Sequence, residues 1–132
     1  MSGGATRNEA ESTVVRALAL AAAFAFGTSA ALHLTRPGRM AGWAAWTRSD
    51  HYQREIAIFD AVHALGLLRL AREPEDAGYL QLVSLTGLLL GLNHHYARRR
   101  GDTGPLLNPL AAWGNTAASS AGLVLAARMR RR

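Results

Sequence analysis

The chain is 132 residues long, which allows one domain. It contains no cysteine, and this excludes disulfide bonds, thiol catalysis and cysteine ligands for a metal. Its 15 basic residues are all arginine, and the net charge is +6. They stand at the ends of apolar segments, which suits lipid headgroups better than a nucleic-acid groove, so we expect no nucleic-acid partner.

Long stretches without charge are the main architectural signal. Residues 17–35, 77–97 and 103–127 contain no Asp, Glu, Lys or Arg over 19, 21 and 25 residues. About 20 apolar residues span the hydrocarbon core of a bilayer. A helix at the surface of a soluble protein would carry charges on its outer face. These stretches therefore predict helices that cross a membrane.

The N-terminal part is predicted to be a disordered tail, residues 1–11, followed by an apolar segment, residues 12–35. Thr28-Ser29-Ala30 also resembles the small-residue cleavage site of a signal peptide. Removal of this segment would leave three spans, so both alternatives stay open. Pro37 and Gly38 end the segment. Trp43 and Trp46 follow in a short linker among arginines, a pattern typical of the headgroup belt.

Three further segments complete the predicted domain. Residues 49–71 form the second, which Ser49 or Asp50 can cap and which carries several charges in its interior. Residues 77–99 form the third and residues 106–128 the fourth, before a basic tail at 129–132. Four spans with short connections predict an all-α fold: an up-down-up-down four-helix transmembrane bundle over residues 12–128.

Small residues predict how the helices pack. Gly87 and Gly91 form a GxxxG motif in the third segment, and Gly114 and Ala118 repeat this spacing in the fourth. Helices in a membrane pack closely where small residues let their backbones approach. We therefore expect Gly87, Gly91 and Gly114 to lie at contacts between helices.

Histidine and acidic residues cluster near three predicted segment ends. The end of the first segment, the start of the second and the end of the third share one membrane face in an alternating bundle. This predicts that His33, Glu55 and one of the two adjacent histidines of the third segment converge. The polar side of the second segment must face the interior, because an exposed ion at mid-depth costs about 3 kcal/mol or more. The candidate cluster comprises His33, His51, Glu55, Asp60, His63, Asn93, His94 and His95.

Three interpretations of this cluster compete. In the first, the polar groups bond to one another and to the loops, with an internal ion-pair network. In the second, histidine and carboxylate ligands bind a transition metal or a haem. The third is a small-molecule or quinone pocket with a histidine that exchanges protons. The ligands of a metal, if one binds, would come from His33, Glu55, His94 and His95.

The order of three sequence stretches resembles the DoxX-like group of small bacterial four-helix membrane proteins. The first is Leu32-His33-Leu34-Thr35-Arg36-Pro37, the second extends from His51 to Asp60, and the third is Gly91-Leu92-Asn93-His94-His95. The likeness covers residues 12–128 and is one of layout. It implies the fold, and none of these residues carries over the sulfur chemistry to which some DoxX relatives are linked.

The sequence thus predicts a multi-pass protein of a bacterial cell membrane, with both termini in the cytoplasm. Its expected role is that of a small membrane subunit or interaction protein, and the alternative is a membrane redox, metal-, haem- or quinone-binding protein. The lipid bilayer is the expected partner, beside a second copy of the chain or another membrane protein. The sequence does not indicate whether the protein is an enzyme.

Overall fold

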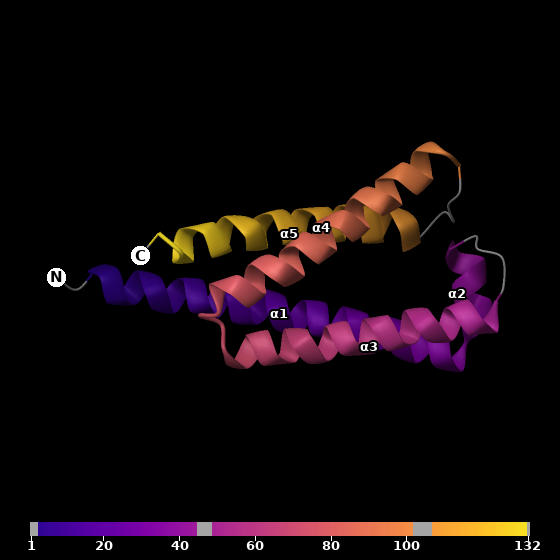
Figure 1. Ribbon diagram of the computed structural model, residues 1–132, viewed down its shortest axis with the longest axis horizontal. Helices are drawn as coiled ribbons and strands as arrows, with labels where there is room; N and C mark the ends of the chain where they lie inside the picture. Colours follow the sequence, from indigo (N-terminus) through magenta and orange to yellow (C-terminus); the bar gives the residue numbers. More distant parts are fainter. Residues whose placement is uncertain (1–2, 45–48, 102–106, 132) are drawn as a thin grey trace.

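The computed structural model describes residues 3–44, 49–101 and 107–131. Within these ranges the chain forms five helices and no strand: α1 (Gly3–Thr35), α2 (Pro37–Ala44), α3 (Asp50–Arg72), α4 (Ala77–Arg99) and α5 (Leu107–Met129). The four long helices run in alternating directions, so both termini lie at one end of the molecule and α2 lies at the other (Figure 1). The all-α class is confirmed, and the four long helices match the four predicted segments.

The helix boundaries follow local capping signals. Of the two residues expected to cap α3, Ser49 is the N-cap, and its side chain accepts a hydrogen bond from the backbone N–H of Tyr52. Asp76 caps α4 in the same way, with a bond of 2.8 Å from the backbone N–H of Tyr79. These caps satisfy amide groups that have no partner inside the helix.

Two parts of the chain are more helical than the sequence suggested. α1 begins at Gly3, within the stretch predicted to be a disordered tail, because Ala, Arg and Glu in that stretch favour continuation of the adjoining helix. The predicted linker contains α2, which begins at Pro37 because proline suits the first position of a helix. α2 buries Met40 and exposes Trp43. Trp46 lies outside the described residues.

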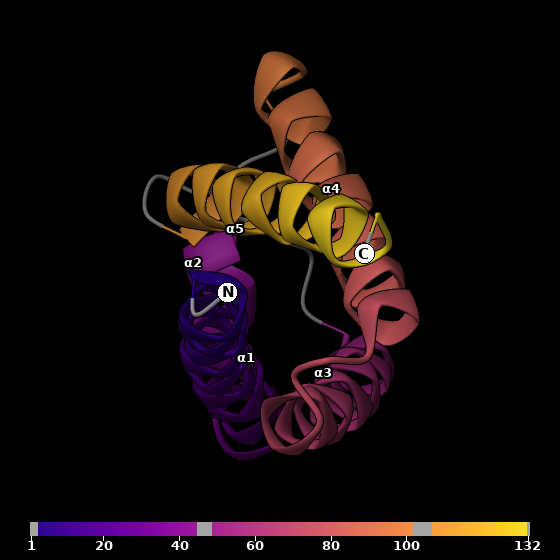
Figure 2. The ribbon, with the colours of Figure 1, turned by 90° about the vertical axis from the view of Figure 1, so that its left-hand side faces the viewer.

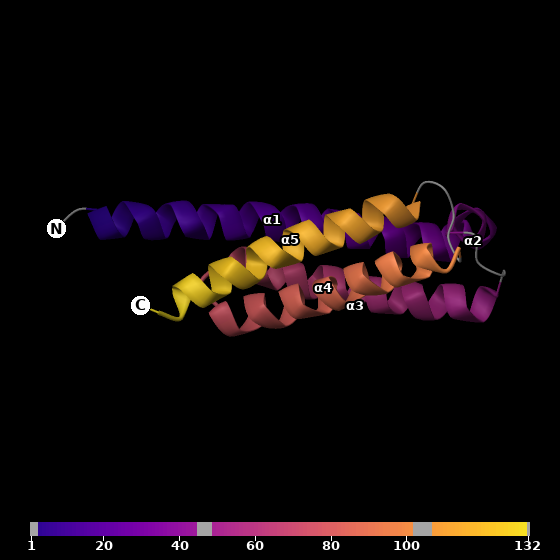
Figure 3. The same ribbon diagram turned by 90° about the horizontal axis from the view of Figure 1, so that it is seen from above.

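The long helices associate in two pairs. α1 packs against α3 and α4 packs against α5 along much of their lengths, whereas the two pairs share few contacts. Seen from one end, the four helices surround a common axis (Figure 2). α4 slants away from α3 as it approaches the α2 end, and α5 crosses beside it (Figures 1 and 3).

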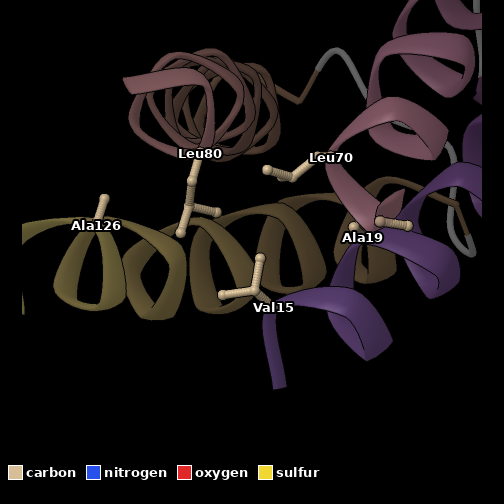
Figure 4. Packing of buried hydrophobic residues seen from close by; sticks show 6 residues of the cluster. Val15, Ala19, Leu70, Leu80 and Ala126 are labelled. Atoms are coloured by element: carbon tan, nitrogen blue, oxygen red, sulfur yellow. The ribbon is translucent and has the colours of Figure 1, made fainter. Parts of the chain in front are cut away.

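The two pairs meet most closely near the turn between α3 and α4. A buried apolar cluster fills this region with side chains from all four long helices (Figure 4): Val15, Ala19, Leu70, Ala71, Leu80 and Ala126. Several members are alanines, so the helices come close together here. This cluster closes one end of the bundle interior.

The contact between α4 and α5 consists of small residues facing one another. A Cβ atom added at Gly87 would overlap Ser119, and one at Gly122 would overlap Ser84. A Cβ at Gly91 would lie 2.9 Å from the backbone nitrogen of Thr116. The two helices can therefore approach at this distance only because these positions lack a side chain. Gly114 differs from the expectation: it is exposed, and an added Cβ would meet no described atom within 4 Å.

The outer faces of the long helices are strongly apolar. The most exposed large side chains include Phe24 at 78%, Leu65 at 66% and Leu110 at 72%, from three different helices. In the described part of the chain, one helical stretch, Glu9–Thr35, is long and apolar enough by composition to cross a membrane, with a mean hydropathy of 1.7. Only 22% of that window is buried, unlike the core helix of a soluble protein.

Candidate polar site between α1 and α3

The interface between α1 and α3 contains a row of buried polar residues. Gln53 and Asp60 are seven residues apart on α3 and share its buried face with Ala57 and Ala64. Ser29 and His33 are four residues apart on α1, so they also share a face. The spacing on each helix thus places polar groups from α1 and α3 in one row. This row, Ser29, His33, Gln53 and Asp60, is called the polar seam below.

One hydrogen bond in this seam joins His33 to Gln53. Nδ1 of His33 lies 2.5 Å from Oε1 of Gln53, and both side chains are almost fully buried. Since the amide oxygen can only accept, His33 donates its Nδ1 proton in this bond. The bond holds the end of α1 against the start of α3.

Asp60 lies deeper in the same seam. Its carboxyl group is buried, bonds to the side chain of Ser29, and interacts electrostatically with His33 and His63. Three of the predicted candidates, His33, Asp60 and His63, are therefore neighbours. A carboxyl group inside a bundle needs such partners, because burial without them is costly.

His63 is held by aromatic rings. Its ring centroid lies 4.6 Å from that of Phe26 and 5.6 Å from that of Phe59, the latter nearly parallel at 17°. Phe26 lies on α1 and Phe59 on α3, so the imidazole is set at the junction of the two helices. His63 also lines a cavity of about 80 Å³ between the helix pairs.

The other candidates lie elsewhere. His51 and Glu55 pair with each other at 3.2 Å on the outside of α3, with 70% and 57% of their side chains exposed. Glu55 thus faces away from the seam, because it is rotated by about 200° from Gln53 on the helix. On α4, Asn93 is exposed and His94 is half-buried. His95 packs edge-on against Trp113 of α5, with ring centroids 4.6 Å apart.

His33, Glu55 and a histidine of α4 were expected to converge. Only His33 lies in the seam, because Glu55 is on the exposed side of α3 and both histidines are on α4. Gln53 occupies the place beside His33 that was expected for Glu55. Among the described residues, no three His, Asp or Glu side chains are grouped so that they could hold a metal ion. Of the set suggested for a metal, His33 is buried between α1 and α3, Glu55 is exposed on α3, and His94 and His95 lie on α4.

Sequence reasoning missed three members of the site. Gln53, Ser29 and Phe26 complete the seam, and none is a typical candidate for chemistry on its own. Their signal was positional: Gln53 is seven residues before Asp60, while Ser29 is one turn before His33.

Comparison of the chain with known protein families, curated proteins and solved structures finds no match. The resemblance to the DoxX-like group stays a prediction.

Proposed function

We propose that the chain is an integral membrane protein whose helices α1, α3, α4 and α5 all cross the bilayer. The observation that carries this proposal is the distribution of side chains. Large apolar residues cover the outside, among them Phe24, Val62 and Leu89. The buried positions hold mostly alanine and a few larger apolar residues such as Leu70, and the buried polar residues are His33, Gln53, Asp60, Ser84 and Ser119. A protein that folds in water normally exposes fewer large apolar side chains than this.

The polar groups support this placement in lipid. A polar or ionisable side chain within a bilayer is tolerated when it faces the bundle interior and has a partner. Asp60 and His33 meet both conditions through Ser29 and Gln53. Charged residues gather instead at the helix ends, as with Arg69 and Arg72 before the α3–α4 turn and Arg98 and Arg99 at the end of α4.

α2 supports the same interpretation. It is a short helix at one end of the bundle, and it lies across the direction of the long helices (Figure 1). It buries Met40 and Ala41 against the bundle while Arg39 and Trp43 are exposed. Tryptophan and arginine together favour the headgroup region. The role that follows is one within the bilayer, as a small subunit or a binding protein for lipid-soluble molecules.

Single-cysteine labelling tests the number of spans, since the chain has no cysteine of its own. We would place cysteine at Glu75 and Arg99, near two turns, and at Val62 and Leu89, on the outer faces of α3 and α4. Sealed vesicles are treated with a membrane-impermeant maleimide from either side. Four spans predict labelling of Glu75→Cys and Arg99→Cys from opposite sides, and protection of Val62→Cys and Leu89→Cys until detergent denatures the protein.

A protein anchored only by α1 would give another result. Val62→Cys and Leu89→Cys would then react without denaturation, because both side chains are more than half exposed in the folded chain. Release of the protein from membranes by alkaline carbonate would reject integral insertion altogether.

A further inference from the structure

The outer face of α2 carries basic and aromatic side chains. α2 packs Met40 and Ala41 against the bundle, and this leaves Arg39 and Trp43 exposed. Arg39 and Trp43 are four residues apart, so they share one face of the helix. Arg36 directly precedes α2 and is also exposed, and its backbone carbonyl accepts hydrogen bonds from the N–H groups of Arg39 and Met40. Arg36, Arg39 and Trp43 are called the α2 patch below.

The two arginines of the α2 patch are not neutralised by the protein. Neither Arg36 nor Arg39 forms an ion pair or a side-chain hydrogen bond with any residue that the structure describes. Two described acidic residues lie at this end of the bundle, and both have other partners: Glu55 pairs with His51, and Asp50 takes part in an interaction of its own. Two guanidinium groups are therefore available for an anion from outside the protein.

The opposite end of the bundle differs because its arginines lie among acidic residues. Nε of Arg69 is 3.4 Å from Oε2 of Glu73, and another nitrogen of the same side chain is 4.0 Å from Oδ2 of Asp76. Arg16 donates a hydrogen bond to the backbone carbonyl of Ala71. Over the described chain, five acidic residues accompany seven arginines at that end, whereas two accompany six arginines at the α2 end. Positive charge that the protein itself does not balance is thus concentrated at the α2 end.

The orientation of α2 gives this charge a specific neighbour. α2 lies across the direction of the long helices (Figure 1), so in the membrane placement proposed above it lies along the bilayer surface. A guanidinium group can form two parallel hydrogen bonds with a phosphate, and tryptophan favours the same headgroup layer. A zwitterionic lipid balances its phosphate with an ammonium group of its own, whereas an acidic lipid does not. The α2 patch therefore suits an acidic headgroup better.

We propose that the α2 patch binds acidic phospholipids, such as phosphatidylglycerol, in preference to zwitterionic ones. Arg36 and Arg39 bind the lipid phosphate, and the ring of Trp43 packs beside the glycerol and the upper part of an acyl chain. The inference rests on the proposed membrane placement, because that placement puts the patch in the headgroup layer. An arginine at an acidic membrane surface strengthens binding roughly fivefold, and salt weakens this attraction.

Tryptophan fluorescence tests the patch, because the chain has three tryptophans. In full-length protein, Trp46→Phe with Trp113→Phe leaves Trp43 as the single, local reporter. The protein is reconstituted into phosphatidylcholine vesicles with increasing fractions of either phosphatidylglycerol or phosphatidylcholine that carries bromine, a quencher, on its acyl chains. Brominated phosphatidylglycerol should quench Trp43 at a mole fraction roughly fivefold lower than brominated phosphatidylcholine, and the difference should shrink at about 1 M salt. Equal quenching by the two lipids would overturn the proposal.

Matched arginine variants locate the binding. Arg36→Gln with Arg39→Gln should remove the preference for phosphatidylglycerol, whereas Arg130→Gln with Arg131→Gln, two exposed positions at the opposite end, should leave it unchanged. Equal loss in both double variants would show that total charge selects the lipid, and would reject the patch. Inorganic phosphate, compared with chloride at equal ionic strength, separates the two sources of a phosphate group. Relief of quenching by phosphate alone would reject a lipid as the ligand.

Failure of this proposal and failure of the four-span placement are distinguishable. α2 follows α1 directly, so it lies at the membrane surface whether four helices or only α1 cross the bilayer. Equal quenching by the two lipids together with the four-span labelling pattern would reject only the lipid preference. A retained preference together with labelling of Val62→Cys and Leu89→Cys would reject only the four-span placement.

Discussion

Nδ1 of His33 and Oε1 of Gln53 lie 2.5 Å apart in the buried seam between α1 and α3. Replacing Gln53 by Leu keeps the volume but leaves His33 buried without this acceptor. We expect Gln53→Leu to reduce the free energy of unfolding by about 1–2 kcal/mol. Thermal unfolding in detergent, followed by circular dichroism, measures the effect. Gln81→Leu on the exposed face of α4 is the control and should change little; equal losses in both would mean that the seam bond is unimportant.

The contact of Gly91 with α5 predicts a difference between two glycines. Gly91→Ala would place a Cβ 2.9 Å from the backbone nitrogen of Thr116 and 3.2 Å from the carbonyl oxygen of Ala112, so α4 and α5 must move apart. Because these backbone atoms can move only if the helix moves with them, we expect a clear decrease in melting temperature. Gly114→Ala meets no described atom and should be neutral or stabilise α5 by up to about 1 kcal/mol. A Gly91→Ala variant as stable as Gly114→Ala would contradict this packing.

The bond between Ser29 and Asp60 predicts coupling between two positions on different helices. Asp60→Ala should destabilise the protein more when Ser29 is present than when position 29 is already alanine. In the Ser29→Ala background the hydrogen bond between the two side chains is already absent, so Asp60→Ala cannot remove it again. A double-mutant cycle of Ser29→Ala and Asp60→Ala measures this coupling, expected at about 0.5–2 kcal/mol. Additive effects would show that the two side chains act independently. Asp60→Asn keeps a hydrogen-bonding group and should be the milder variant.

The close approach of Tyr79 to Gly66 predicts that a smaller side chain at position 79 restores stability lost by enlarging position 66. A Cβ at Gly66 would collide with the hydroxyl of Tyr79, where α4 passes α3 near their connecting turn. Gly66→Ala should therefore lower the melting temperature, and Tyr79→Phe in the same chain should restore much of the loss by removing the colliding oxygen. A double variant no more stable than Gly66→Ala alone would show that the tyrosine ring, rather than its hydroxyl, sets the spacing.

The long helices could be predicted from sequence because their signals are local. Absence of charge marked their extent, and Ser49 marked the start of α3. The bounds of α4, Ala77–Arg99, agree with the predicted third segment for the same reason. α2 was not predicted, because eight residues that begin with a proline carry too little periodicity to separate a short helix from a loop.

The polar site could be predicted only in part because helix rotation is not a local property. His33 and Asp60 were expected inside the bundle, and both are buried. Glu55 was expected beside His33, yet Gln53 is there, two residues earlier and on the opposite side of α3. Which side turns inward depends on the fit of Ala57 and Ala64 against α1, a matter of packing that the spacing of polar residues alone does not determine.

The pairing of α1 with α3 has a consequence for synthesis. Ser29, His33, Gln53 and Asp60 all lie in the first 72 residues, and each finds its partner within that half. A ribosome that has completed α3 has therefore supplied every group needed to cover these polar atoms before α4 emerges. The first hairpin can therefore close its polar seam before the second hairpin is made. Separate expression of two chains divided at Pro74, in the turn between the hairpins, should accordingly reassemble the protein.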